Sequence, residues 1–235
     1  MYKSKSILCV IPARIGSKGV KRKNLRKLLG KSLFEWPLDE AKKSKFVDNI
    51  IISSDSEKII KIAKKKGVLA PFKRPKKISS DKSTSVDVVL HSINFFENKS
   101  KFFDYVILLE PTSPLTTFKD IDKAIKILID NKYAKSIVGV TLNIGRHPYF
   151  NYTVEKNGII VPFSKKIKNL RRQDLPTCYY LNGNLYISEV KYLKKTKSFY
   201  HNHTTGYTSE KWKSIEIDDE YDLIMTEAII SKING

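Results

Sequence analysis

The stretch that decides the fold is Ile7-Leu8-Cys9-Val10-Ile11-Pro12-Ala13-Arg14-Ile15-Gly16-Ser17-Lys18-Gly19. Its first five residues are all apolar, which is typical of a strand buried on both faces of a parallel sheet. The run is too short for a signal peptide or a membrane span, and Pro12 ends it. In parallel sheets ligands bind beyond the carboxyl ends of the strands, so residues 13–24 are the first candidate binding segment.

Short apolar runs alternate with longer amphipathic stretches over the first 140 residues. Runs at 49–53, 105–109 and 136–142 predict further strands. Apolar residues at helical spacing predict helices over 31–43, 56–66, 83–98 and 118–131. The alternation predicts an α/β fold, with a mainly parallel twisted sheet and helices on both faces, as in Rossmann-like folds.

The pattern changes after residue 142. Lys156-Asn157-Gly158 between two apolar stretches predicts a hairpin, and 179–187 is strand-like. Residues 213–217 predict a last strand, and 218–232 a terminal amphipathic helix. We therefore expect a single domain over 1–235, with a β insertion at about 143–190.

The composition is strongly basic. The chain has 44 Lys+Arg and 24 Asp+Glu, a formal net charge of +20, but only seven of the basic residues are Arg. Base readout and bidentate phosphate contacts favour Arg, so dispersed lysines favour a solvated surface over nucleic-acid binding. Two cysteines, without zinc-site spacing, fit a reducing compartment, and we expect a soluble cytoplasmic protein.

Residues 13–24 combine glycines with a dense set of cations. Gly16 and Gly19 allow a tight turn that brings N–H groups to an anion. The cations are Arg14, Lys18, Lys21, Arg22 and Lys23. Their place after a buried strand favours a polyphosphate ligand over a flexible basic loop. No GxGxxG fingerprint is present, and Leu25 stands where a Walker A loop ending in Gly30-Lys31-Ser32 needs glycine.

The segment Ile-Pro-Ala-Arg-x-Gly-Ser-Lys-Gly at 11–19, followed by Lys23-Asn24, resembles the signature of the acylneuraminate cytidylyltransferases. This family includes CMP-sialic acid and CMP-legionaminic acid synthetases. Further family-like motifs follow in order: Ser53-Ser54-Asp55, Arg74-Pro75 with Asp81 and Ser85, Leu-Glu-Pro-Thr-Ser-Pro-Leu at 109–115, Arg-Arg-Gln-Asp-Leu-Pro at 171–176 leading into 182–186, and Ile-Glu-Ile-Asp at 215–218 with Asp222.

The resemblance implies transfer of CMP from CTP to the anomeric hydroxyl of a nonulosonic acid of the sialic or legionaminic type, with release of pyrophosphate. It implies a nucleotidyltransferase domain, Mg²⁺ as cofactor, and a homodimer in which the β insertion reaches a second subunit. Such CMP-sugars serve the biosynthesis of cell-surface polysaccharide. Transfer to another sugar acid such as KDO, and a non-catalytic basic nucleic-acid-binding protein, stay open as alternatives.

The resemblance also assigns roles to single residues. Those expected to act in catalysis are Arg14, Lys18, Lys23 and Asp218. Those expected to contact CTP are Ser17, Gly19, Asn24, Arg74 and Ser85. Those expected at the sugar acid are Glu110, Thr112, Ser113, Arg172, Gln173, Asn182, Tyr186, Phe199 and Tyr200. The expected metal ligands are Glu216 and Asp218, since Mg²⁺ takes hard oxygen ligands.

Several of these positions also have structural explanations or depart from the family pattern. Asp218 is suited to capping the last helix, and Phe199 and Tyr200 to core packing. Glu216 stands where the family usually has Asp, and Glu110 where it commonly has Gln. An ionised carboxylate at 110 cannot donate a hydrogen bond, which indicates a different sugar. The sequence identifies neither that sugar nor the general base.

Overall fold

The computed structural model describes residues 1–16, 19–81, 83–143, 145, 147–163 and 171–234. Its central sheet has six strands in the order β10-β6-β9-β5-β1-β4. Their bounds in chain order are β1 Ile7–Pro12, β4 Asn49–Ser53, β5 Tyr105–Leu108, β6 Ser136–Leu142, β9 Tyr179–Glu189 and β10 Thr204–Thr208. The short pairs are β2 (Lys27–Leu28) with β3 (Lys31–Ser32), and β7 (Tyr152–Val154) with β8 (Ile160–Pro162).

β1 lies inside the sheet and pairs in parallel with both β4 and β5. β10 is parallel to β6, whereas β9 runs antiparallel to both of its neighbours. Successive β1 side chains enter opposite cores: Ile7, Cys9 and Ile11 face one, and Leu8 and Val10 the other. The predicted mainly parallel twisted sheet is confirmed, with β9 as the reversed strand.

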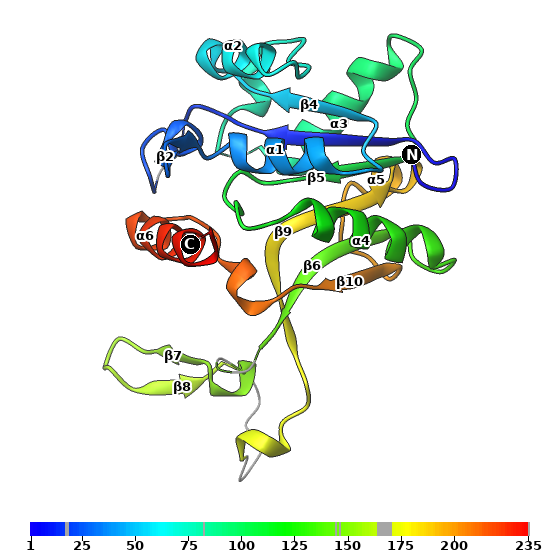
Figure 1. Cartoon of the computed structure of the whole chain (residues 1–235). Coiled ribbons are helices and arrows are strands. Elements are labelled where there is room, and N and C mark those ends of the chain that lie inside the picture. Colours follow the sequence, from blue (N-terminus) through cyan, green and yellow to red (C-terminus); the bar gives the residue numbers. More distant parts are fainter. Residues whose placement is uncertain (17–18, 82, 144, 146, 164–170, 235) are drawn as a thin grey trace.

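Helices cover both faces of this sheet, as predicted (Figure 1). Helices α1 (Glu35–Lys43), α2 (Glu57–Lys65) and α4 (Phe118–Asp130) contribute to one core, and α3 (Ser85–Glu97) and α5 (Val190–Thr196) to the other. The terminal helix α6 (Glu220–Asn234) packs in a third, smaller cluster. None of the described helices has the length and apolarity to cross a membrane.

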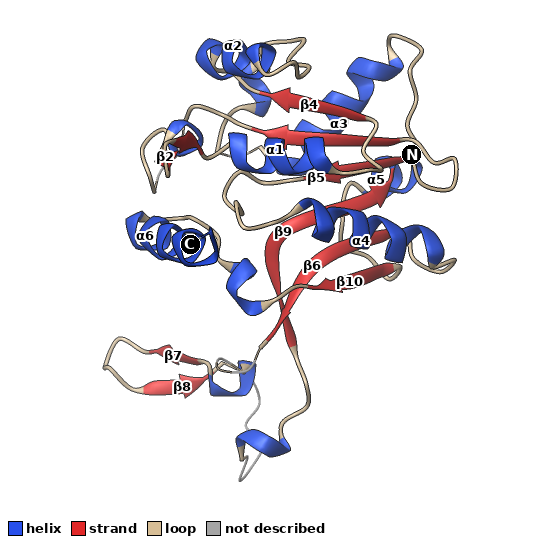
Figure 2. Cartoon of the chain, viewed as in Figure 1, coloured by secondary structure: helices blue, strands red, loops and turns tan. Residues whose placement is uncertain are grey.

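Strands β6 and β9 extend beyond the rest of the sheet and lead to the β7–β8 hairpin, which stands away from it (Figure 2). The hairpin turns at Gly158, whose φ of +82° suits glycine, so the turn predicted from Asn157-Gly158 is confirmed. We call the described residues beyond these strand ends, 147–163 and 171–178, the arm, and several apolar side chains of its hairpin are exposed.

The predicted last strand over 213–217 is wrong. Residues Lys211–Ser214 form a short 3-10 helix, η5, and 215–218 run on without joining a sheet. The sixth strand is β10, whose polar sequence gave no strand signal because Tyr207 is its only buried residue. Ile217 packs instead with Leu223 and Ile230 of α6. Four further 3-10 turns are η1 Lys23–Leu25, η2 Lys76–Ile78, η3 Pro148–Phe150 and η4 Arg172–Asp174.

Replacing Ile107 in β5 tests the dependence of the fold on this sheet. Its side chain is fully buried between β1 and β9, so Ile107→Ala should cost about 2–5 kcal/mol of unfolding free energy. Urea unfolding measures the loss, and the exposed Ile224→Ala in α6 is the matched control. Equal losses in both variants would contradict the assignment of the core.

Candidate functional site

A cavity of about 400 Å³ opens at the carboxyl ends of β1 and β5, where the sequence placed the ligand. Many of the predicted residues line it together. They are Arg14, Gly19, Lys23, Asn24, Arg74, Ser85, Glu110, Thr112 and Asp218. Ser17 and Lys18 belong to the same segment but lie outside the described residues. The cavity thus joins the predicted catalytic, CTP-binding and acidic positions in one place.

The basic loop after β1 is held by the segment after β4. The Ser54 hydroxyl donates to the carbonyl oxygen of Ala13 at 2.5 Å, and the amide of Ile15 donates to Asp55 at 2.8 Å. From within the loop, the Asn24 side-chain amide donates to the carbonyl of Arg14 at 2.8 Å. Asn24 therefore supports the loop as well as lining the cavity.

Two cations of the loop are held at the cavity by acidic partners. Arg14 pairs with Asp81 at 2.6 Å. Lys23 donates to the carbonyl of Ile217 at 2.8 Å and to Asp218 at 2.9 Å. Gly19 lies so close to the backbone carbonyl of Asp218 that a Cβ atom would collide with it. The loop and the acidic segment are therefore packed against each other.

Arg74 is the most informative cation of the cavity. Only 4% of it is exposed, and its Nε and Nη2 atoms are buried without an acceptor among the described residues. Burial lowers the pKa of its guanidinium; Asp55 and Glu110 oppose this change and Arg14 adds to it. Unsatisfied buried N–H groups are costly, so oxygen or nitrogen acceptors of a ligand would stabilise this side chain.

Glu110 and Ser85 meet on the cavity wall. Ser85 is the first residue of α3, whose start is set by a capping box between Thr84 and Asp87. Its hydroxyl donates to Glu110 at 2.6 Å. Burial raises the pKa of Glu110, and Glu216 adds to the increase, while Ser85 and Arg74 oppose it. A carboxyl group thus stands where a polar ligand could exchange hydrogen bonds with it.

Of the two predicted metal ligands, Asp218 lines the cavity, whereas Glu216 lines a second cavity beside Ile215 and Tyr180. Glu216 is half-buried and packs over Gly183, where φ is +63° and a Cβ atom would collide with the carboxylate. Burial, and then the neighbouring Asp218, raise the pKa of Glu216, while Lys23 lowers it. A divalent cation would relieve this repulsion, so the pair fits magnesium, which often takes one or two carboxylates plus phosphates and waters.

A protein-only metal centre does not form in the described part of the chain, where no three His, Cys, Asp or Glu side chains gather to hold an ion.

The predicted sugar-contacting residues are more widely spread than the nucleotide-contacting ones. Thr112 lines the cavity, but the buried Ser113 hydroxyl donates to the Gly183 carbonyl at 3.3 Å. Asn182 is buried in the sheet, where its amide donates to Thr141 at 2.8 Å and Ser209 at 2.6 Å. Both side chains therefore hold the scaffold next to the cavity.

The predicted aromatic residues form a cluster behind the acidic pair. Tyr186 lies 5.5 Å from Phe199 and 6.1 Å from Tyr200, measured between ring centres. Phe199 belongs to the buried core, which favours the packing interpretation, and Tyr200 is exposed. The pKa of Tyr186 is raised by burial, then by the Tyr200 hydroxyl, and also by Glu216 and Glu110. This phenol therefore lies close enough to both carboxylates to interact with them electrostatically.

The remaining two predicted sugar contacts lie in the arm. Gln173 is exposed in η4. Arg172 belongs to the same turn, and its side chain lies outside what the structure describes. The structure thus places the Arg-Arg-Gln-Asp motif on the projecting arm rather than on the cavity wall.

Supporting residues were not assigned roles from the sequence. Asp55, Asp81 and Gly183 each stand inside a segment already noted for its motif, yet no local pattern shows what they contact. Asp55 receives the Ile15 amide, Asp81 pairs with Arg14, and Gly183 makes room for Glu216. All three contacts join segments that are distant in the sequence.

Known proteins resemble the chain over nearly its whole length. The model of the family described as "Cytidylyltransferase" matches residues 8–234. "Post-translational flagellin modification protein B" of Campylobacter coli is 34% identical over 97% of this chain and 96% of that protein. "Pseudaminic acid cytidylyltransferase" of Campylobacter jejuni is 31% identical, covering 97% of both chains. "CMP-N,N'-diacetyllegionaminic acid synthase" of the same species is 33% identical, covering 97% and 96%.

A solved structure shares the fold. It is a CMP:2-keto-3-deoxy-manno-octonic acid synthetase complexed with CTP, with a TM-score of 0.72 and 15% sequence identity. The similarity covers 97% of this chain and 99% of the other. At this identity the comparison supports the architecture alone.

The raised pKa of Glu110 predicts a pH-dependent stability. The folded protein favours the protonated carboxyl of Glu110. The stability that this preference contributes is therefore full below the unfolded pKa, near 4.3, and is lost as pH rises through the folded pKa. Glu110→Gln keeps an acceptor for Ser85, so the Tm of this variant minus that of wild type should be larger at pH 7 than at pH 4. Thermal unfolding at both values measures this. Glu155→Gln, at an exposed position, is the control. A Tm difference between Glu110→Gln and wild type that is the same at both pH values would contradict the raised pKa of Glu110.

Proposed function

The chain belongs to the cytidylyltransferase family, and we propose that it transfers CMP from CTP to the anomeric hydroxyl of a nonulosonic acid, giving a CMP-sugar and pyrophosphate. The observation that carries the proposal is the cavity itself. It sets the buried Arg74, the cations Arg14 and Lys23 and the carboxylate of Asp218 around one space. Glu216 lines a second cavity and interacts electrostatically with Asp218 and Lys23. A nucleoside triphosphate and a metal ion need this combination of groups.

The reaction demands charge stabilisation above all. The sugar hydroxyl oxygen bonds to the α-phosphorus and its proton passes to solvent, while the bond from that phosphorus to the bridging oxygen breaks and pyrophosphate leaves with the electron pair. Negative charge is spread over phosphate oxygens throughout, so pre-positioned cations lower the barrier. Arg14 and Lys23 are already held in place by Asp81 and Asp218, which limits the reorganisation needed on binding.

We propose magnesium as the cofactor, with Glu216 and Asp218 as its protein ligands. Burial, and next the neighbouring Asp218, raise the pKa of Glu216, and a cation near both carboxylates would offset this effect. The ion, when bound, would neutralise charge on the phosphates. Lys23 already contacts Asp218, so this lysine can orient the carboxylate whether or not an ion is present.

We propose that the sugar acid binds between the cavity and the arm. Glu110 and Thr112 lie on the cavity wall, and Arg172 and Gln173 belong to the arm. We propose that Arg172 binds the sugar carboxylate, because the planar guanidinium matches that group. The names of the relatives point to pseudaminic and legionaminic acids as first candidates, and KDO belongs to a neighbour that shares the fold.

We propose a homodimer joined through the arm. Val154, Ile160 and Phe163 of the hairpin region are 71%, 59% and 72% exposed, which is unusual for apolar side chains standing together. A second copy covering them would also bring Arg172 and Gln173 near a neighbouring cavity.

The unpaired cysteines Cys9 and Cys178 fit the cytoplasmic location expected from the sequence.

Substrate turnover gives the direct test. The purified chain with CTP and Mg²⁺ should release pyrophosphate with at least one of pseudaminic, legionaminic and N-acetylneuraminic acids, and less with KDO. A coupled pyrophosphate assay measures the rates. Absence of release with all four acids, by a protein shown to be folded by circular dichroism, would exclude the proposed reaction.

Removing the charge of a carboxylate that lines the cavity should lower turnover, whereas removing the charge of its neighbour should not. Asp218→Asn should lower kcat by about 10²–10³-fold, the usual effect of losing one charge-stabilising contact. Asp219→Asn is the matched control, since this neighbour caps the amide of Asp222 and does not line the cavity, and Asn caps helices well. Similar rates for the two variants would contradict the role of Asp218.

Charging the arm should separate the subunits. Phe163→Asp should shift the protein from dimer to monomer in size-exclusion chromatography with light scattering, because a carboxylate in an apolar interface is costly. Phe102→Asp, equally exposed on the main domain, should leave the dimer intact. A wild-type chain that is monomeric throughout would refute the dimer.

A further inference from the structure

The carboxylates of the site stand on a segment that no sheet positions. Residues 215–218 follow η5 and pair with no strand of the described chain. A catalytic pair of carboxylates nevertheless needs to be held close to its productive geometry. The contacts at the two ends of this segment must therefore determine where Glu216 and Asp218 lie.

The downstream end is anchored through the backbone. The amide of Ile217 donates to the carbonyl of Thr112 at 2.8 Å. The carbonyl of Ile217 accepts from Lys23 at 2.8 Å. The segment is thereby tied to the turn after β5 and to the basic loop.

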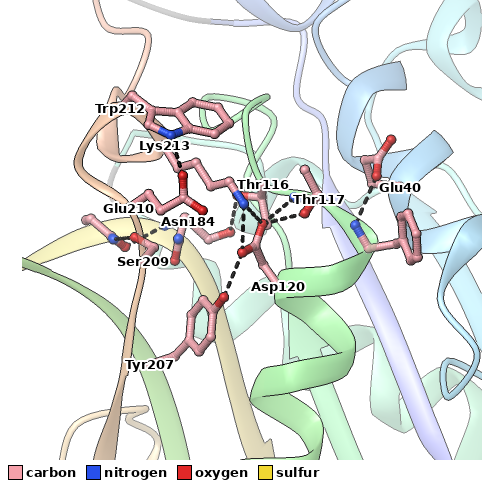
Figure 3. A network of polar contacts seen from close by, with 12 residues as sticks. Glu40, Thr116, Thr117, Asp120, Asn184, Tyr207, Ser209, Glu210, Trp212 and Lys213 are labelled. Atoms are coloured by element: carbon pink, nitrogen blue, oxygen red, sulfur yellow. Dashed lines mark hydrogen bonds and ion pairs between the residues drawn. The ribbon is translucent and has the colours of Figure 1, made fainter. Parts of the chain in front are cut away.

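The upstream end is anchored by a buried ion pair (Figure 3). Lys213 donates to both carboxylate oxygens of Asp120, at 2.9 and 2.8 Å. The two side chains are only 9% and 6% exposed. Among the described lysines and arginines of this highly basic chain, only Arg74 and Lys213 are buried.

Asp120 is itself held from three directions. It belongs to the capping box of α4, where it accepts from the Thr117 amide at 2.9 Å and hydroxyl at 2.6 Å. The Tyr207 hydroxyl, from β10, donates to it at 2.6 Å. Figure 3 shows these groups converging on one carboxylate. Lys213 is therefore attached to a carboxylate that has little freedom to move.

Both anchors belong to one rigid unit. Thr112 and Asp120 are joined by the turn that leads into α4, and this turn is pinned to β9 by two hydroxyl contacts. Ser113 donates to the carbonyl of Gly183 at 3.3 Å, and Thr116 to that of Asn184 at 3.2 Å. Glu216 packs over the same Gly183. The distance between the Thr112 carbonyl and the Asp120 carboxylate is therefore fixed, and with it the position of Glu216 relative to β9.

We propose that Lys213 and Asp120 are positioning residues, whose buried ion pair determines where Glu216 and Asp218 lie and thereby how tightly the complex of CTP and divalent metal is bound; this rests on the proposed function. A buried ion pair is weak evidence for stability, because apolar replacements are often as stable. Its place here, one turn before the carboxylates, gives it a geometric role instead.

The test separates positioning from stability. Lys213→Met and Asp120→Asn each leave a buried charge without its partner, so both should lower Tm. The double variant Lys213→Met/Asp120→Asn removes both charges and should recover much of the lost Tm. Binding of Mn²⁺ in the presence of CTP is followed by electron paramagnetic resonance, and hydrogen exchange over 215–219 is measured by mass spectrometry without metal.

Positioning predicts that the double variant stays impaired although its Tm recovers. We expect its affinity for Mn²⁺ with CTP to be about 10–100-fold weaker than wild type, the usual effect of losing a supporting contact behind a metal ligand. Exchange at 215–219 should be faster than in wild type. A double variant that binds Mn²⁺ and exchanges like wild type would overturn the proposal.

Two further variants complete the design. Lys66→Met breaks the partly buried pairs of Lys66 with Glu35 and Asp39, both at 3.1 Å and away from the cavity, and should lower Tm without changing Mn²⁺ binding. If the double variant does not fold, Tyr207→Phe keeps both charges and should show the same changes in smaller measure. Wild-type turnover is measured in parallel, so a failure of the proposed reaction is seen separately from a failure of positioning.

Discussion

The site depends on the complete burial of β1. All six of its residues are covered on both faces, and its two parallel neighbours run in the same direction. The carboxyl ends of these strands consequently meet at one edge of the sheet. The loops that follow β1 and β5 carry Arg14 and Glu110, which is why residues distant in the sequence share one cavity. Asp55, after β4, supports the first of these loops by accepting from the Ile15 amide.

The position of a charged residue in this protein says more about its role than the net charge does. Most of the net charge of +20 comes from lysines on the surface. The buried cations differ: the Nε and Nη2 atoms of Arg74 have no acceptor among the described residues, whereas Lys213 is paired with Asp120. Arg74 lines the cavity, and Lys213 joins two parts of the scaffold.

Glu216 and Asp218 are held in position without belonging to a strand or a helix. Glu216 and Asp218 were expected on a strand, where alternate side chains share a face. They lie instead on an extended segment held by the Thr112 carbonyl, by Lys23 and by the ion pair of Lys213. Their proposed role as metal ligands does not depend on the strand, because residues two apart can share a side of any extended backbone.

The sequence by itself determined most strands of the sheet, most of the helices and many of the residues that line the cavity. Apolar runs such as 7–11, and glycines beside cations at 14–23, are local signals that do not depend on distant partners. Tertiary structure alone decided the rest. It showed β10 as a strand, because an edge strand buries little, and it placed Asn182 in the sheet and Gln173 on the arm. The pairings of Arg14 with Asp81 and of Lys213 with Asp120 span 67 and 93 residues, and chain folding rather than local pattern chooses such partners.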